Sequence, residues 1–193
     1  MSGNQYQERD FEHPSRLWIL EDILKGLVGG NLLYGPYMRT FGLQGNERVL
    51  DFGCGSGIAA QCLANILNGN GYLMCVDVSR YWVGKARKRL RKYANVECAA
   101  GDIRTLDIPD SSFDVISSIH VIHDISPLAR QEIVKALSQK LKAGGTFFIR
   151  EPVKKSHGMP AGEIRSLFSA AGLTEIEHKE TKSEYLGKYK KAG

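Results

Sequence analysis

The stretch Val49-Leu50-Asp51-Phe52-Gly53-Cys54-Gly55-Ser56-Gly57 decides the fold of this 193-residue chain. An apolar run ends in an acid and is followed by three alternating glycines, an order typical of a buried strand that turns sharply into a helix. Because glycines leave the main chain bare, a ligand can lie directly against such a turn. The stretch therefore predicts a nucleotide-like cofactor at the carboxyl end of a buried strand.

The spacing of the glycines narrows the identity of that cofactor. Dinucleotide dehydrogenases favour G-x-G-x-x-G, whereas here the third glycine comes one residue earlier and Ile58 takes its place. An acid two residues before the first glycine would repel a diphosphate but suits a ligand that bears an ammonium group. The pattern Asp-x-Gly-x-Gly-x-Gly resembles motif I of the class I S-adenosylmethionine-dependent methyltransferases. The resemblance implies that the amino-acid part of S-adenosylmethionine is wrapped by Asp51, Gly53, Cys54, Gly55 and Gly57.

Three further predicted strands end in residues that the same resemblance assigns to the cofactor. The strand at 72–76 ends at Asp77, whose carboxylate can accept hydrogen bonds from both ribose hydroxyls. The strand at 96–100 is followed by a corner similar to the family's adenine-binding corner, and a fourth strand covers 113–119. The implied contacts are Asp77, Val78, Asp102, Ile103 and Ser118. Helix capping by Asp77 and a turn role for Asp102 are the alternatives.

Strands and amphipathic segments alternate along the chain, which favours a parallel sheet covered by helices. The predicted helices are 58–67, 80–93, 127–141 and 161–171, and Ala143-Gly144-Gly145 is expected to close the third of them before a fifth strand at 145–149. Alternating stretches at 174–178 and 185–189 predict a final hairpin. The fold class is therefore α/β. The resemblance implies a Rossmann-like doubly wound sheet of seven strands in the order 3-2-1-4-5-7-6, with strand 7 antiparallel and helices on both faces.

The length predicts a single domain over residues 1–193, with an N-terminal helical cap at 1–46 and the Rossmann-like core at 47–193. Residues 17–28 carry apolar side chains on a wide helical face and are expected to pack as a lid or cap. Tyr34 and Tyr37 follow this segment and are candidates for the wall of an acceptor pocket. Simple anchoring of the cap explains the two tyrosines equally well.

Methyl transfer from a sulfonium asks mainly for positioning, since the positive charge already activates the methyl group. A base is needed only where the acceptor must lose a proton, and histidine suits that work near neutral pH. His120 and His123 follow the fourth strand and are the catalytic candidates, with capping or packing as the alternative. Glu151 and His157 are further residues that could face the acceptor. No metal is predicted, because His120, His123 and Asp124 lack a fourth ligand.

The amino-acid composition narrows the class of protein and its surroundings. The net charge of +5 and the pI near 9.0 raise the question of nucleic acid, but the basic run at 85–92 is read as a solvated helix surface. No apolar run is long enough to span a membrane, and the polar amino terminus does not resemble a signal peptide, so a cytoplasmic protein is expected. The four cysteines lack paired C-x-x-C spacing and are expected to be buried, reduced thiols.

The sequence thus predicts a methyltransferase that uses S-adenosylmethionine, releases S-adenosylhomocysteine, and acts on a small molecule such as a metabolite, a lipid or a quinone-type precursor. Two alternatives stay open. One is an RNA or protein methyltransferase that uses the basic surface residues. The other is a subunit that binds the cofactor without catalysing transfer. The sequence identifies neither the acceptor atom nor the oligomeric state.

Overall fold

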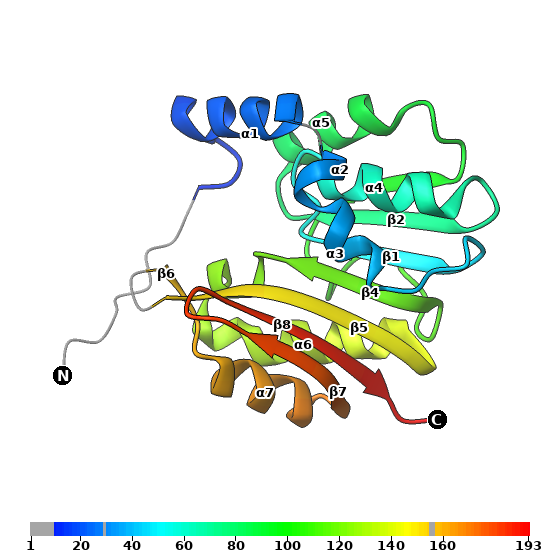
Figure 1. The fold of residues 1–193 in the computed structure, drawn as a ribbon, viewed down its shortest axis with the longest axis vertical. Coiled ribbons are helices and arrows are strands. Elements are labelled where there is room, and N and C mark those ends of the chain that lie inside the picture. The colour runs from blue at the N-terminus through cyan, green and yellow to red at the C-terminus, as the bar shows by residue number, and fades with distance from the viewer. Residues whose placement is uncertain (1–9, 29, 155–156) are drawn as a thin grey trace. The chain divides into compact units, whose positions relative to one another are not determined.

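The computed structural model describes residues 10–28, 30–154 and 157–193. These residues form two compact units, Asp10–Asp102 and Ile103–Gly193, which we call the N-terminal and the C-terminal unit. Each unit holds its own strands and helices (Figure 1). The predicted count of one domain stays a prediction.

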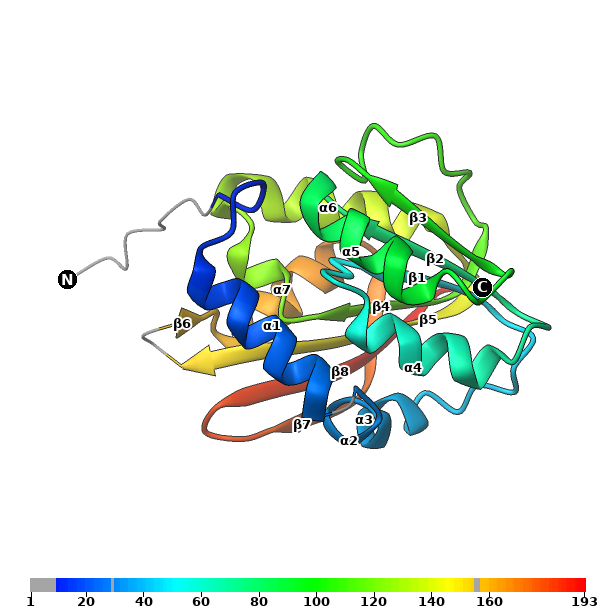
Figure 2. The ribbon, with the colours of Figure 1, turned by 90° about the horizontal axis from the view of Figure 1, so that it is seen from above.

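The N-terminal unit contains three parallel strands and five helices. The strands pair in the order β3-β2-β1, with Asp51 opposite Cys75 and Cys75 opposite Cys98. The helices α4 and α5 lie side by side and pack against β2 (Figure 2). The elements are α1 (Arg16–Val28), α2 (Gly30–Leu33), α3 (Gly35–Arg39), β1 (Arg48–Phe52), α4 (Ile58–Leu67), β2 (Tyr72–Asp77), α5 (Arg80–Leu90) and β3 (Val96–Ala100).

Helix α4 shows why the local sequence folds as predicted. Its apolar stripe faces inward, and Ala60, Leu63 and Leu67 are fully buried. The helix ends at Leu67 and is capped by Asn68, which adopts a left-handed backbone with φ of +46° and donates its main-chain N–H to the carbonyl of Ala64. The polar Asn-Gly run after the stripe therefore marks the end of the helix, as the sequence indicates.

The C-terminal unit contains a mixed sheet and two longer helices. Strand β4 pairs with β5 in parallel, and β8 pairs antiparallel with both β5 and β7, so the order is β4-β5-β8-β7. Helix α6 packs against β5 and helix α7 against β7. The elements are β4 (Phe113–Ile119), the 3-10 turn η1 (Ile122–Asp124), α6 (Pro127–Lys140), β5 (Leu141–Lys154), β6 (His157–Gly158), α7 (Ala161–Ala170), β7 (Leu173–Glu180) and β8 (Glu184–Lys191).

The strand order of the whole sheet is β3-β2-β1-β4-β5-β8-β7, with the short β6 paired to the end of β5. Counting only the seven long strands, this order is 3-2-1-4-5-7-6, and the seventh strand runs antiparallel to its neighbours. The predicted Rossmann-like fold class is confirmed. In the part of the chain that is described, no helix is long and apolar enough to cross a membrane.

Two predicted elements differ from the structure. Helix α6 ends at Lys140, and the predicted closing residues Ala143-Gly144-Gly145 lie inside β5 instead. The strand starts early because Ser111 and Ser112 donate to the carbonyls of Gln139 and Lys140, which ends the helix before the glycines. The apolar side of α1 was expected to pack, yet Leu17, Leu20 and Leu24 are 76%, 52% and 53% exposed.

Candidate active site

The glycine turn after β1 has the geometry that its sequence predicts. The glycines Gly53, Gly55 and Gly57 have φ of +72°, +51° and +80°, a region that other residues adopt at a cost. A Cβ atom on Gly57 would lie 3.2 Å from Ala86 of α5, whereas a Cβ atom on Gly55 would meet nothing within 4 Å. Gly57 thus permits close helix packing, and Gly55 leaves an open surface along the main chain.

Asp77 at the carboxyl end of β2 ties this turn to the start of α5. Its Oδ2 accepts a hydrogen bond from the main-chain N–H of Gly55 at 2.9 Å, and its Oδ1 accepts one from that of Ser79 at 3.0 Å. Burial raises the pKa of the Asp77 carboxyl, although these main-chain donors favour its charged form. The N-cap of α5 is Ser79, whose hydroxyl accepts from the N–H of Trp82, so Asp77 does not cap the helix directly.

The corner after β3 also contacts Asp77, through its main chain. The main-chain N–H of Gly101 donates to the Asp77 carbonyl at 2.9 Å, and Asp102 follows directly. Val78 is 60% exposed, which is unusual for a branched apolar residue between a strand and a helix. The turn, Asp77 and the corner before Asp102 therefore converge within one unit, as right-handed crossovers require.

Two other predicted residues of this unit are buried. Asp51 lies within β1 and is 2% exposed. Cys54 contacts the thiol of Cys75, which lowers the pKa of the Cys54 thiol, but burial and the nearby charges of Asp51 and Asp77 raise it overall. A thiol that keeps its proton is a poor nucleophile, so Cys54 serves the turn through packing. Within the described residues, no group of three or more His, Cys, Asp or Glu could hold a metal ion.

Ser56 in the glycine turn makes contacts that the sequence did not predict. Its hydroxyl donates to Asp22 Oδ1 of α1 at 2.5 Å, and its carbonyl accepts from Arg89 Nε of α5 at 2.9 Å. These contacts join segments far apart in the sequence, and no periodicity signals them. They fix both sides of the turn, and they show that Arg89 is not simply part of a solvated helix surface.

Tyr34 and Tyr37 differ in their surroundings. Tyr37 is buried and its ring packs edge to face against Phe41, with 5.1 Å between ring centroids. Tyr34 is the N-cap residue of α3 and is partly exposed. The packing of Tyr37 fits the anchoring alternative, part of Tyr34 is accessible, and a pocket role for either tyrosine stays a prediction.

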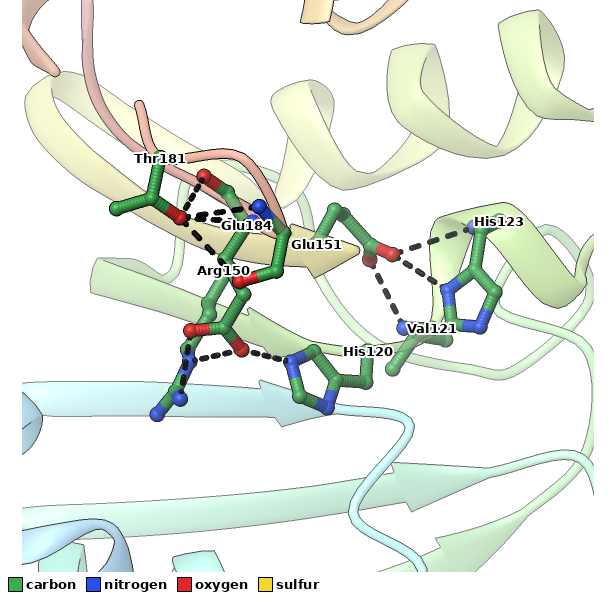
Figure 3. A network of polar contacts seen from close by, with 8 residues as sticks. His120, Val121, His123, Arg150, Glu151, Thr181 and Glu184 are labelled. Carbon is green, nitrogen blue, oxygen red and sulfur yellow. Dashed lines mark hydrogen bonds and ion pairs between the residues drawn. The ribbon is translucent and has the colours of Figure 1, made fainter. Parts of the chain in front are cut away.

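In the C-terminal unit, His123 is enclosed by carboxylates. Its Nδ1 lies 2.6 Å from Glu151 Oε2, and its Nε2 lies 3.4 Å from Asp124 Oδ1 (Figure 3 shows the Glu151 contact). Glu151 is fully buried and also accepts from the main-chain N–H groups of Val121 and Ile122, each at 2.8 Å. Glu151 therefore organises the turn after β4, and the side chain of His123 is only 3% exposed.

His120 is the more accessible of the two predicted histidines. It follows β4 directly, its side chain is 41% exposed, and its Nε2 lies 2.9 Å from Glu184 Oε1 of β8 (Figure 3). Burial among these residues lowers the pKa of His120, while the carboxylates of Glu151 and Glu184 act to raise it. The ring is thus neutral near pH 7.

The other predicted residues of this unit are buried. Ile103 is 1% exposed and Ser118 is fully buried. Among the residues that the structure describes, the hydroxyls of Ser117 and Ser118 have no hydrogen-bond partner. A buried hydroxyl without a partner is costly and calls for a ligand or a water at that position. The side chain of His157 lies outside the described part.

Comparison with known proteins shows a match to the model of a family described as "methyltransferase domain", over residues 49–145. The chain is 26% identical over 153 residues to a carboxy-S-adenosyl-L-methionine synthase of Shewanella loihica, covering 74% of this chain and 61% of that protein. It is also 26% identical over 168 residues to the mouse tRNA N(3)-cytidine methyltransferase METTL2, covering 71% of this chain and 43% of that protein. The chain thus spans about half the length of these relatives.

Solved structures share the fold. An S-adenosylmethionine-dependent methyltransferase from Aquifex aeolicus superposes with a TM-score of 0.70 at 21% identity, over 81% of this chain and 88% of the other. The N-methyltransferase NodS from Bradyrhizobium japonicum, solved with S-adenosyl-L-homocysteine, gives a TM-score of 0.65 at 19% identity, over 76% and 78% of the two chains. At these identities the likeness concerns the fold alone.

Proposed function

We propose that this chain, which belongs to the methyltransferase-domain family, transfers a methyl group from S-adenosylmethionine to a small-molecule acceptor. The methyltransferase family and the Rossmann-like fold that the sequence predicts are confirmed, and the donor S-adenosylmethionine is part of the proposal. The acceptor and the roles of individual residues are the proposal. A single observation carries it, namely the hydrogen bond between Asp77 and the main chain of Gly55, which sets a carboxylate beside an open turn.

The residues of the N-terminal unit fit the methyl donor. We assign the amino-acid part of the donor to the turn formed by Asp51, Gly53, Cys54, Gly55 and Gly57. The carboxylate of Asp77 has lone pairs left after its two main-chain bonds, and these can accept the ribose hydroxyls. The exposed side chain of Val78 offers an apolar surface for the adenine ring, and Asp102 and Ile103 follow at the next strand end. Ser118, buried and without a described partner, is the remaining assigned contact.

When bound, S-adenosylmethionine supplies a methyl group that is already activated by the sulfonium charge. The chain's own work is then to hold the acceptor in line and to exclude water. An acceptor that must lose a proton needs a neutral base, and His120 and His123 are the candidates at the carboxyl end of β4. Tyr34 and Glu151 stay candidates for the surroundings of the acceptor, the latter through the turn that it holds in place.

The hydrogen bonds that two basic residues make within the protein favour a small acceptor over a nucleic acid. Two arginines of the predicted basic run are engaged within the fold, because Arg87 donates to the carbonyl of Cys98 and Arg89 to that of Ser56. Fewer cations are then left for a phosphate backbone. The second candidate is an RNA acceptor, supported by the net charge of +5 and by the similarity to a tRNA methyltransferase.

Transfer of an isotopically labelled methyl group tests the proposal. The protein is incubated with methyl-labelled S-adenosylmethionine and, in separate reactions, with a metabolite and lipid extract, total RNA and a protein extract. We expect label in the small-molecule fraction only, and less label with the Asp77→Asn variant when the donor concentration is limiting. Label in RNA or protein would contradict the small acceptor, and donor binding without transfer to any fraction would contradict the enzyme.

A further inference from the structure

Three charged or titratable residues from three strands meet beyond the end of β4. His120 follows β4, Arg150 lies on β5, and Glu184 begins β8. Glu184 Oε1 lies 2.9 Å from His120 Nε2 and accepts from Arg150 Nε at 3.0 Å, while Oε2 accepts from the Arg150 guanidinium at 2.9 Å (Figure 3). Arg150 therefore holds both oxygens of Glu184, and Glu184 in turn contacts the imidazole.

The ionisation of Glu184 decides which ring nitrogen of His120 carries the proton. Burial acts to raise the pKa of Glu184, but the hydrogen bonds and charge of Arg150 lower it overall, so this carboxylate is charged at neutral pH. A carboxylate only accepts hydrogen bonds, so a neutral His120 must donate from Nε2. Its lone pair then lies on Nδ1, which has no hydrogen-bond partner among the described residues.

The main chain at His120 is held in an unfavourable conformation. Its φ is +57°, in the left-handed region that residues other than glycine rarely adopt. The His120 N–H donates to the Arg150 carbonyl at 2.7 Å, which helps to keep this geometry. Such conformations persist only where the surroundings enforce them, and they concentrate at functional sites. Arg150 thus holds His120 in two ways. Its carbonyl accepts from the main chain of His120, and its guanidinium holds Glu184, which contacts the imidazole.

We propose that Arg150 and Glu184 are positioning residues that orient His120 as the general base, with Nδ1 directed to the acceptor. The base takes a proton from the acceptor atom as that atom attacks the methyl group, and Glu184 stabilises the imidazolium that forms. The inference rests on the proposed function and assigns two residues that no motif marks. His123 does not offer such a lone pair, because both of its ring nitrogens face carboxylates and its side chain is 3% exposed.

The charges around His120 predict that removing Glu184 and removing Arg150 shift the pKa of His120 in opposite directions. Glu184 and Glu151 act to raise the pKa of His120, whereas burial and Arg150 lower it. Glu184→Gln should therefore lower the pKa of His120 further. The same substitution should remove the preference of the ring for the Nε2–H tautomer. Arg150→Gln should raise the pKa of His120. The pKa shifts and the tautomer report how Arg150 and Glu184 hold the imidazole, and a loss of kcat with KM retained reports its role as the base.

Nuclear magnetic resonance of the ring nitrogens of the full-length protein tests this inference without any acceptor. The resonances of His120 are identified by their loss in His120→Asn, and its tautomer and titration are followed in the parent, Glu184→Gln and Arg150→Gln. Glu177→Gln is the control, because that carboxylate is 74% exposed on β7. Thermal unfolding and titration with S-adenosylmethionine establish that each variant folds and binds the donor.

The expected result is an Nε2–H tautomer in the parent and in Glu177→Gln, and opposite pKa shifts in the two test variants. Equal tautomer populations in the parent, or a His120 pKa that neither substitution moves, would overturn the inference. Unaltered donor binding in such a case would leave the proposed function standing, so the two failures are distinguishable. With an acceptor in hand, Glu184→Gln should reduce kcat by at least about tenfold while KM is retained.

Discussion

Asp77 braces the glycine turn with the same carboxylate that we propose for the ribose of the donor. Two of its lone pairs are taken by Gly55 and Ser79, and burial raises its pKa. The sequence placed an acid at the end of the second strand, but it did not indicate that this acid would brace the glycine turn. That contact arises from tertiary geometry, since 22 positions separate Gly55 from Asp77.

Asp77→Asn should weaken binding of S-adenosylmethionine by about tenfold or more, because a charged acceptor for the ribose is lost, on the order of 1.5 to 3 kcal/mol. Isothermal titration calorimetry checks this. Asp110→Asn is the control, since that side chain is 62% exposed. Equal affinities of the parent and of Asp77→Asn would remove the ribose assignment.

The two histidines after β4 should respond differently to replacement by asparagine. His120→Asn should keep the melting temperature, because asparagine tolerates a left-handed backbone, and should reduce turnover of a proton-losing acceptor by about 10²- to 10⁴-fold. His123→Asn should destabilise the protein by roughly 1 to 3 kcal/mol, since Glu151 loses a buried partner.

Denaturant unfolding and turnover measurements on His120→Asn and His123→Asn distinguish the catalytic histidine from the structural one. A stable His123→Asn variant with depressed turnover would instead assign the base to His123.

The pH dependence of turnover follows from the lowered pKa of His120. The neutral ring is the active base, so turnover should hold at neutral pH and fall as the pH drops through the pKa of His120, below the usual 6.5. The pH profile of kcat measures this. In His120→Asn the same acidic limb should disappear, and a limb that persists there would assign the titration to another group.

At the scale of elements, the glycine turn connects β1 to α4 and packs against α5. The sequence predicts the backbone conformation of the turn, but not how closely α5 packs against each glycine. The pattern of three glycines predicts positive φ, and the structure has it at all three. The pattern does not convey that a Cβ atom on Gly57 would lie 3.2 Å from Ala86, whereas a Cβ atom on Gly55 would meet nothing within 4 Å. One glycine is required by packing, and the other leaves room for a ligand.

Gly57→Ala should destabilise the protein by about 1 to 3 kcal/mol, because a Cβ there is crowded by α5 and the backbone is left-handed. Gly84→Ala is the matched comparison on α5, where a Cβ would meet nothing within 4 Å. It should stabilise the protein by roughly 0.5 to 1 kcal/mol through helix propensity. Denaturant unfolding measures both, and equal stabilities of the two variants would refute the packing role of Gly57.

Element boundaries were predictable where polar caps end an apolar stripe, as at Asn68. They were not predictable for the start of β5, because the last residues of α6, Gln139 and Lys140, accept hydrogen bonds from Ser111 and Ser112 that no local pattern encodes. The apolar spacing of residues 17–28 correctly predicts the helix α1, but it does not show which side is attached. The structure attaches the helix through Asp22, a polar residue, and exposes its leucines.

At the scale of the whole molecule, the strands could be predicted because their patterns are local in sequence, and their order could be predicted from the resemblance that the glycine motif carries. The donor contacts of the N-terminal unit stay predictions. The cluster of His120, Arg150 and Glu184 could not be predicted, since its members come from three strands and carry no shared motif. The excess of positive charge also does not identify an acceptor, because the sequence does not reveal that Arg87 and Arg89 bind main-chain carbonyls.

Titration of the purified protein with S-adenosylmethionine, S-adenosylhomocysteine and reduced nicotinamide adenine dinucleotide tests the central claim most directly. The carboxylate of Asp77 beside the open turn predicts saturable binding of the first two ligands and no retention of the dinucleotide. Tight binding of the dinucleotide, with neither S-adenosyl compound retained, would contradict the account.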